Sequence, residues 1–539
     1  MPGAPYHTGE WTALKDHYAS RDKTITEDES VKSAKGALVP SLESPFEAAE
    51  GRRAAIERRV RSAILDGALG PGARLPSTRA LARELDVSRT TAEEAFAQLV
   101  AEGYLVRRVG DGTYVTSALP PPPRPRRSAR AVSLLSARGR ALASAPACLD
   151  AAQVVPFRAA HPDYEAFPLG LWNRLLARRA RRSGERLLGY GDAAGLAALR
   201  EALAGHLATS RGVRCDRSRI VVLSSSQQGM DLAARLVLDR EDEAWVEEPG
   251  YPGVRGVLAT AGARAIPVPV DAHGLDVAAG VRLAPKARLA HVTPSHQYPL
   301  GAPLALERRL ALLDWATGAG ALVLEDDYDG EYRYGGRAIA SIQSLDTEGR
   351  VLYLGTFTKM LFPSLRLAWA VLPESLVEPF IHARRLQDGQ PPGLSQAVAA
   401  DFVGEGHLLA HLRRMRALYA ERREELASAL GQELGDAGRL LGAEAGLHAV
   451  LPLDADDVEV AGQAARRGLE VIPLSTLYCR EPKSCGLVLG YAGLRPAAIR
   501  AGVVALSGAI EAARRRAKTR AAGSSGPASP RPPTRPSPP

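Results

Sequence analysis

The run Leu119-Pro-Pro-Pro-Pro-Arg-Pro-Arg-Arg constrains this chain most, because it interrupts any regular fold. Proline fixes its own φ angle and lacks a backbone N–H, so consecutive prolines fit neither a helix interior nor a central strand. Such a run forms a stiff, extended spacer. At 539 residues the chain is also too long for one ordinary domain. We therefore expect folded units on both sides of a Pro/Arg-rich linker over residues 118–155.

The positive charge of the chain is concentrated in the linker and at the C-terminus. The net charge is +9, but residues 118–140 hold six arginines and residues 514–539 hold seven basic residues, with no acid in either segment. The remainder of the chain is therefore slightly acidic. We predict a disordered N-terminal extension over residues 1–43 and a basic disordered tail over 514–539. Such segments either strengthen DNA binding by counterion release or only keep the protein soluble, so charge alone does not assign a function.

The sequence lacks the usual signals for export or membrane insertion. The first 30 residues are polar, and no apolar run reaches the roughly 18–20 residues that span a bilayer. The four cysteines are scattered without disulfide or metal spacing, which favours free thiols. We therefore expect a cytoplasmic protein with no membrane partner and no structural metal.

Residues 44–117 have the pattern of three helices followed by a hairpin. A first helix is predicted over residues 47–65; Ser77 suits the N-cap of a second, which ends near Leu85, and Ser88 suits the N-cap of a third. Strands are predicted over Tyr104–Arg108 and Thr113–Thr116. A helix pair with a tight turn fits the DNA major groove, and the hairpin would be its wing. A helical hairpin without DNA function remains the alternative from periodicity alone.

From residue 156 to residue 513 apolar strand-like runs alternate with helical segments. This alternation predicts a mostly parallel sheet covered by helices. The runs are Ile220–Leu223, Ala244–Val246, Ala265–Val268, Leu289–Val292, Ala321–Leu324, Val351–Leu354 and Leu367–Val371.

Several polar residues directly follow these runs, at the edge where open α/β sheets bind ligands. Pyridoxal 5'-phosphate (PLP) requires a lysine for a Schiff base, an acid for its pyridine nitrogen, an aromatic ring and phosphate donors. The sequence offers a candidate for each need. Lys359 is the lysine, Asp326 or Asp327 is the acid, Tyr251 is the aromatic ring, and Tyr328 is a contact for the ring hydroxyl. The candidate phosphate donors are Ser226, Gln227, Thr356, Thr358 and Arg366. The acids could instead bind Mg²⁺, but no P-loop accompanies them.

The N-terminal unit resembles the GntR-type winged helix-turn-helix. The resemblance is carried by Gly70-Pro-Gly-Ala-Arg-Leu-Pro-Ser-Thr-Arg, Val87-Ser-Arg-Thr-Thr and Gly110-Asp-Gly-Thr-Tyr-Val. It implies binding to a double-stranded DNA operator. The residues it implicates are Arg74, Ser77, Arg79, Ser88, Arg89 and Thr90, with Gly112 at the minor groove. Glu93 departs from the pattern, since some members carry arginine there and a carboxylate does not bind phosphate favourably.

Residues 156–513 resemble the fold type I aminotransferases, specifically the MocR branch of GntR regulators. The matching segments include Tyr190-Gly-Asp-Ala-Ala-Gly-Leu, Thr293-Pro-Ser-His-Gln-Tyr-Pro-Leu-Gly, Glu325-Asp-Asp-Tyr-Asp-Gly-Glu-Tyr-Arg-Tyr and Gly355-Thr-Phe-Thr-Lys. The resemblance implies a large α/β domain with a small C-terminal α+β subdomain, and a homodimer. It makes Lys359 the Schiff-base lysine, Asp326 the pyridine partner, Tyr328 the contact of the ring hydroxyl and Tyr251 the stacking ring. Arg366 and Thr356 would bind the phosphate.

Two departures from the aminotransferase pattern bear on function. Ser225 stands where the phosphate loop usually has glycine, which predicts a less permissive backbone. Aminotransferases anchor the substrate α-carboxylate with an arginine on a late strand. In this chain the expected place of that arginine falls near Val488, and Arg480 is the nearest basic alternative. Loss of that contact would cost about 1.5–3 kcal/mol.

Three functional hypotheses follow from these observations. The first is a regulator whose PLP on Lys359 senses a small-molecule effector, which would be an amine, an amino acid or PLP itself. The second is a working aminotransferase with a DNA-binding appendage. The third is a regulator that has lost the cofactor. The apparent loss of the carboxylate anchor favours the first hypothesis over the second.

Overall fold

The computed structural model describes residues 51–118, 135–144, 155–159, 161–182, 187–335 and 339–524. The chain divides into two compact units, with the boundary between residues 133 and 134. Each unit is described by itself below. The N-terminal 43 residues and most of the predicted linker lie outside the described residues.

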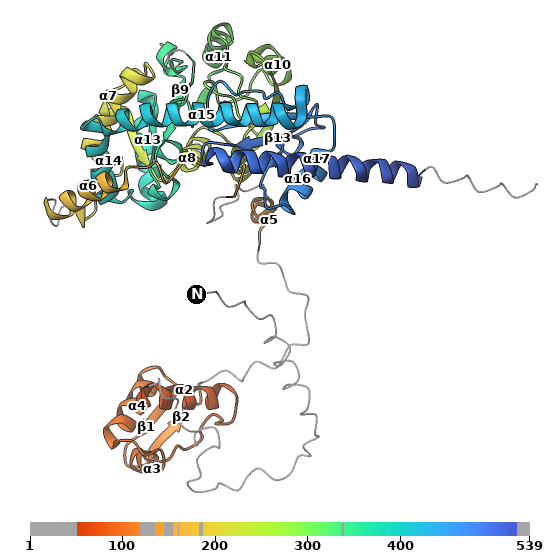
Figure 1. Cartoon of the computed structure of the whole chain (residues 1–539). Helices are drawn as coiled ribbons and strands as arrows, with labels where there is room; N and C mark the ends of the chain where they lie inside the picture. The colour runs from red at the N-terminus through yellow and green to blue at the C-terminus, as the bar shows by residue number, and fades with distance from the viewer. Residues whose placement is uncertain are drawn as a thin grey trace, which may run out of the picture. The chain divides into compact units, whose positions relative to one another are not determined.

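The smaller unit is a three-helix domain with a two-stranded hairpin (Figure 1), as the sequence predicts. Its elements are α2 (Arg52–Leu65), α3 (Thr78–Glu84), α4 (Arg89–Ala101), β1 (Leu105–Arg108) and β2 (Gly112–Val115). The predicted caps are confirmed, because the Ser77 side chain accepts from the Ala80 N–H and the Ser88 side chain from the Thr91 N–H. A core that includes Ile56, Leu81, Phe96, Leu105 and Val115 holds the elements together.

The larger unit is built on an eight-stranded mixed sheet with the order β3-β10-β9-β8-β7-β4-β5-β6. Each predicted apolar run is a strand, which confirms the predicted fold class. The strands are β3 (Ile220–Leu223), β4 (Glu243–Glu248), β5 (Arg264–Asp271), β6 (Gly274–Leu275), β7 (Leu289–Val292), β8 (Leu322–Asp327), β9 (Val351–Thr356) and β10 (Ala368–Val371). Strands β3, β7, β8 and β9 are buried along their whole length, as expected for a sheet that helices cover.

Helices cover the sheet and connect its strands (Figure 1). They are α6 (Leu169–Arg182), α7 (Ala197–Ser210), α8 (Ser226–Val237), α9 (Pro252–Ala261), α10 (Val277–Leu283), α11 (Leu306–Ala319), α12 (Phe357–Met360), α13 (Glu374–Asp388), α14 (Gly393–Gly404) and α15 (His407–Leu434).

A smaller three-stranded sheet follows, in the order β11-β13-β12, which is the small C-terminal α+β part expected from the sequence. It comprises β11 (His448–Leu453), α16 (Asp457–Ala465), β12 (Ile472–Pro473) and β13 (Cys485–Gly490), and α17 (Pro496–Ser524) follows it. The segment Pro496–Thr519 of α17 contains an 18-residue window of mean hydropathy 1.3, which is long and apolar enough to cross a membrane. Ile499, Val503, Leu506 and Ile510 are nevertheless buried in the main core, so this is a core helix.

Two predicted boundaries are wrong. The tail expected to be disordered from residue 514 begins inside α17, where Arg514 donates to Asp454 and Arg516 to Glu459. These ion pairs hold the first basic residues against α16 and its preceding loop, so the helix continues beyond the core. The linker expected over 118–155 contains a helix, α5 (Ala137–Ser144), which packs on α9.

Candidate cofactor site and DNA-binding surface

Strand β10 brings the candidate phosphate donors to one edge of the sheet. It runs antiparallel between β3 and β9, and its first residue, Ala368, pairs with Leu223 on one side and Thr356 on the other. The carboxyl ends of β3 and β9 therefore meet the start of β10. This register places the α8 N-terminus, Thr356 and Arg366 at the same sheet edge.

The Lys359 backbone is held from two directions. Lys359 lies in the short helix α12, whose N-cap Thr356 accepts from the Thr358 N–H. The buried Tyr332 hydroxyl donates to the carbonyls of Lys359 and Met360 at 3.3 and 3.1 Å. His411 Nε2 lies 3.0 Å from the Met360 carbonyl. Lys359 thus projects from a fixed turn at the end of β9, as a Schiff-base lysine requires.

The two adjacent acids of β8 have different surroundings. Asp327 is saturated, because Arg211 donates to both of its oxygens at 2.7 and 2.9 Å and the Tyr353 hydroxyl donates at 2.6 Å. Asp326 is equally buried, but its Oδ1 has no hydrogen-bond partner among the described residues. His291 Nε2 lies 3.7 Å from the other oxygen of Asp326, Oδ2. A buried acceptor without a donor is costly, so Asp326 fits a pyridine N–H that the protein itself does not supply.

The N-terminus of α8 is compatible with an anion. Ser225 is the N-cap, and its side chain accepts from the Gln228 N–H, while Ser226 and Gln227 form the first turn. Ser225 has φ −168°, an extended conformation open to any residue, so the concern raised by the missing glycine is unfounded. Arg366 is exposed and has φ +53°, a left-handed conformation that costs a non-glycine residue about 1–3 kcal/mol and often marks a functional site.

Two tyrosines line the same edge. The Tyr251 hydroxyl donates to Gln227 Oε1 at 3.3 Å, and Gln227 Nε2 donates to the Gly253 carbonyl at 2.9 Å. These contacts join the predicted stacking ring to the predicted phosphate loop. The Tyr328 hydroxyl lies 3.1 Å from both Nδ1 and the carbonyl oxygen of His296.

The late strand β13 carries no charged anchor at the expected place. Val488 pairs with Val450 and Ile472, and it is fully buried in an apolar cluster with Leu474 and Leu477. Arg480 is exposed, in the segment whose backbone N–H groups donate to Glu248. The Val488 position is thus apolar in the structure as well as in the sequence.

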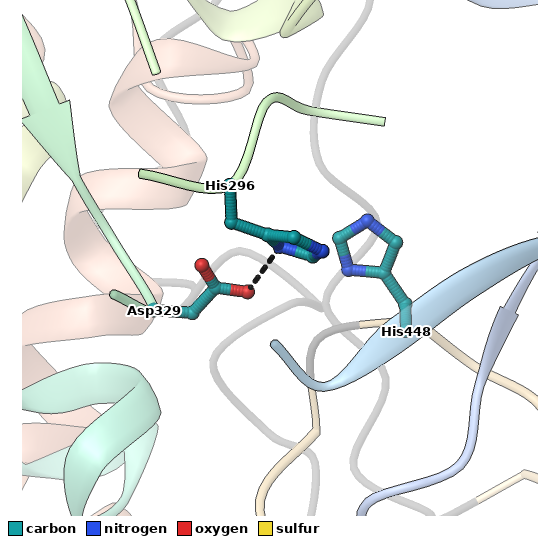
Figure 2. Close-up of side chains that lie close together, drawn as sticks. All are labelled: His296, Asp329 and His448. Carbon is teal, nitrogen blue, oxygen red and sulfur yellow. Dashed lines mark hydrogen bonds and ion pairs between the residues drawn. The ribbon is translucent and has the colours of Figure 1, made fainter. Parts of the chain in front are cut away.

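Sequence reasoning missed a buried cluster beside this site. His296, Asp329 and His448 are each at most 2% exposed, and their ligand atoms lie within 4.8 Å of one another (Figure 2). Sequence reasoning also missed Arg211, the partner of Asp327. His296 and Asp329 belong to segments that we singled out for other reasons, whereas His448 and Arg211 gave no local signal.

The residues predicted to bind DNA lie at the surface of the small unit. Arg79, Arg89 and Thr90 are exposed in the first turns of α3 and α4, and Ser77 and Ser88 are the caps of those helices. Arg74 is also exposed, but its guanidinium donates to the Asp111 carbonyl at 2.5 Å in the turn of the wing. Gly112 has φ +128°, and a Cβ there would lie 3.3 Å from Arg74 Nε.

The unusual acid in α4 has a partner within the domain. Glu93 forms an ion pair with Arg107 of β1 at 2.5 Å. Burial opposes ionisation of Glu93, but hydrogen bonds from Arg107 and Thr78 lower its pKa. Glu93 therefore joins α4 to β1 of the hairpin, and this ion pair gives the carboxylate a partner inside the domain.

Both units match known families. Residues 52–115 match the bacterial regulatory proteins of the gntR family, and residues 164–506 match aminotransferase class I and II. Among solved structures, a kynurenine aminotransferase from Pyrococcus horikoshii shares 27% identity with a TM-score of 0.62, covering 67% of this chain and 91% of that one. The α-aminoadipate aminotransferase LysN from Thermus thermophilus shares 26% identity with a TM-score of 0.63, covering 67% and 93%.

Relatives that span both units are transcriptional regulators. The probable rhizopine catabolism regulatory protein MocR of Rhizobium meliloti is 40% identical over 84% of this chain and 92% of its own length. TauR of Rhodobacter capsulatus is 34% identical over 86% and 98%, and the pyridoxine biosynthesis regulator PdxR of Corynebacterium glutamicum is 32% identical over 81% and 91%. The chain therefore belongs to the MocR type of gntR-family transcriptional regulators, in which a winged helix-turn-helix domain is joined to an aminotransferase-like domain.

Proposed function

We propose that this regulator holds PLP as a Schiff base on Lys359 and uses it to sense a small amine, an amino acid or PLP itself. The observation that carries the proposal is the buried Asp326 Oδ1, which has no donor among the described residues although the adjacent Asp327 is saturated. This unpaired carboxylate oxygen lies at the sheet edge that also carries Lys359. It is a suitable partner for the protonated pyridine nitrogen of PLP, which needs an anion beside it.

The remaining candidates fit the other parts of the cofactor. Tyr251 supplies an aromatic face, Tyr328 a hydroxyl for the ring oxygen, and the first turn of α8 a set of N–H groups for the phosphate. Thr356, Thr358 and Arg366 stand at the same edge of the sheet. When bound, PLP supplies a carbonyl carbon that forms a C=N bond with an amine.

Sensing is favoured over steady transamination by the Val488 position. A substrate α-carboxylate placed against Val488 would meet a buried apolar cluster and lose a contact worth about 1.5–3 kcal/mol. An amine without an α-carboxylate loses nothing there. Transamination remains the alternative, and steady turnover of an amino donor and a keto acid by the purified protein would favour it.

We infer that the small unit binds a DNA operator through α3, α4 and the wing. A regulator with this function acts in the cytoplasm, where the chromosome lies. Ligand exchange at Lys359 would alter DNA binding or transcription only if the ligand has different affinities for two arrangements of the protein.

A homodimer is supported by an exposed apolar surface on the large unit. Leu188 and Tyr190 are 83% and 104% exposed, and Leu386 at the end of α13 is 76% exposed. Gln390 bonds the backbone of Gly189 and Gly191, so these two segments lie side by side. Because the resemblance to the MocR branch implies a homodimer, a second copy of the chain is the occupant we infer.

Replacing Lys359 tests the cofactor assignment. We expect Lys359→Ala to abolish the borohydride-trapped phosphopyridoxyl label, which mass spectrometry should place on Lys359 in the unchanged protein. Lys286→Ala removes an exposed lysine and should keep the label. A label that persists in Lys359→Ala, or is absent from PLP-treated unchanged protein, contradicts the proposal.

The two acids of β8 should respond differently to amidation. Asp326→Asn should weaken PLP retention about 10- to 150-fold, the equivalent of 1.5–3 kcal/mol, with little effect on unfolding. Asp327→Asn should lower the free energy of unfolding by about 3–5 kcal/mol, because Arg211 is left buried without its anion. Denaturant titration of the apoprotein and equilibrium dialysis of PLP measure the two effects. The reverse pattern would move the pyridine contact to Asp327.

Arg89 should carry operator specificity. Arg89→Ala should weaken binding to DNA from upstream of the protein's own gene by about 1–3 kcal/mol and reduce discrimination against unrelated DNA. Arg53→Ala is the matched control, since Arg53 is paired with Glu57 and Glu94 and lies outside the predicted contact set. Fluorescence anisotropy at several salt concentrations separates base from phosphate contacts. Equal losses in both variants would argue against a base contact.

The exposed apolar surface should control association. The double variant Leu188→Asp, Leu386→Asp should sediment as a monomer at concentrations where the unchanged protein is a dimer, because two buried carboxylates oppose pairing. Leu306→Asp places the same charge on α11, at a residue that is 60% exposed, and should leave the dimer intact. A monomeric unchanged protein, or a dimer that persists in the double variant, contradicts the inference.

A further inference from the structure

The arginines on the predicted DNA-binding surface of the small unit differ in their partners within the protein. Arg79 and Arg89 lie in the first turns of α3 and α4, and neither forms a hydrogen bond or ion pair with another described residue. Arg107 of β1 is different, because its guanidinium is paired with the carboxylate of Glu93 in α4 at 2.5 Å. The surface therefore combines arginines that are free to bind DNA with one that an acid of the protein already occupies.

The pair lies where α3, α4 and the hairpin meet. Arg107 is on the same face of β1 as the buried Leu105, so its side chain is directed toward the helices and not away from them. Glu93 is one helical turn after Arg89, and it also accepts a hydrogen bond from the side chain of Thr78, the first residue of α3. The carboxylate of Glu93 thus contacts all three elements that we predict to face DNA.

The pair is too exposed to be a major source of stability. The side chains of Arg107 and Glu93 are 45% and 44% exposed, and ion pairs in such positions contribute little to the free energy of unfolding. The apolar core that includes Phe96 and Leu105 holds the elements together instead. The main consequence of the pair is electrostatic, because Glu93 cancels the charge of Arg107 at a place that solvent and other anions can reach.

Loss of one free cation affects unrelated DNA more than an operator. Binding to unrelated DNA comes almost entirely from cations that neutralise phosphates and release counterions, whereas contacts to base edges carry sequence preference. Base contacts fix the position of a domain on its operator, so a further arginine there cannot move to the best phosphate. On unrelated DNA the domain is free to adopt the position in which every available cation meets a phosphate. An acid that occupies Arg107 therefore acts against the wrong DNA.

We propose that Glu93 increases the DNA specificity of this protein by keeping Arg107 paired within the domain, so that Arg107 contributes little to sequence-independent phosphate binding. The proposal rests on the DNA binding proposed above. Glu93 acts through Arg107 and is a positioning residue. A direct contact between Glu93 and a cytosine amine is the alternative. The pairing is favoured over that contact because Arg107 and Thr78 already donate to the carboxylate of Glu93.

The test measures binding of the full-length protein to two DNA duplexes of equal length at several salt concentrations. One duplex comes from upstream of the protein's own gene, and the other is its scrambled sequence. Glu93→Gln should raise the affinity for the scrambled duplex about 5- to 10-fold near 0.1 M salt, and less for the first duplex. The plot of log K against log salt concentration should steepen by about 0.9 for each domain that contacts the scrambled duplex, as expected for one more phosphate contact.

Glu94→Gln is the matched control, because it removes the same charge from the next residue of α4. The partner of Glu94 is Arg53 of α2, at 3.7 Å, which lies outside the predicted contact set. This variant should leave the salt slope unchanged. The double variant Glu93→Gln, Arg107→Gln should return the slope to that of the unchanged protein, because the cation that Glu93→Gln releases is then absent. The exposure of the pair keeps these variants folded.

Several results would overturn the role of Glu93. Equal effects of Glu93→Gln and Glu94→Gln would reduce it to a general effect of charge, and a slope that stays steep in the double variant would exclude Arg107 as the released cation. Weaker binding of Glu93→Gln to the upstream duplex alone would replace the pairing with a direct base contact. A full-length protein that binds neither duplex at low salt would overturn the proposed DNA binding as well, whereas binding with the same slope in every variant would overturn this inference alone.

Discussion

The register of β10 determines where the chemistry of this protein lies. Because Ala368 pairs with both Leu223 and Thr356, the ends of two parallel strands and the start of an antiparallel one share a single edge. The helix N-terminus after β3 is far in sequence from the lysine after β9 and the arginine before β10, and it becomes their neighbour only through this pairing. A slip of one residue in β10 would turn every side chain of the strand to the other face of the sheet.

The two buried carboxylates at the end of β8, Asp326 and Asp327, have different surroundings. Asp327 is bonded to Arg211 and Tyr353, a fully satisfied arrangement that fixes β8 and β9. Asp326 points to the opposite face, because side chains alternate along a strand, and has an acceptor left open. Adjacent residues of one type therefore serve different purposes. The left-handed conformation of Arg366 is a local strain that the surrounding strands hold in place.

Much of the fold was predictable because it depends on local pattern. The strands, the helix caps and the hairpin follow from apolar runs, Ser77, Ser88 and the glycine-rich turn. The residues alone left the choice between Asp326 and Asp327 open, and only the family resemblance favoured Asp326, since the difference depends on Arg211, which lies 116 residues from Asp327. His448 was missed for the same reason: its meaning comes from contact with residues of another sheet. The extension of α17 was misjudged because a basic composition suggests disorder, whereas Arg514 and Arg516 find acids in space.

The His296 cluster lies where the two sheets of the large unit meet. His448 begins β11 of the small sheet, whereas Asp329 follows β8 of the large sheet. His296 bonds both Asp329 and the carbonyl of Gly442, so buried polar contacts hold the small sheet beside the strand that carries Asp326. A ligand at Lys359 acts as a switch only where its affinity differs between two arrangements of the protein.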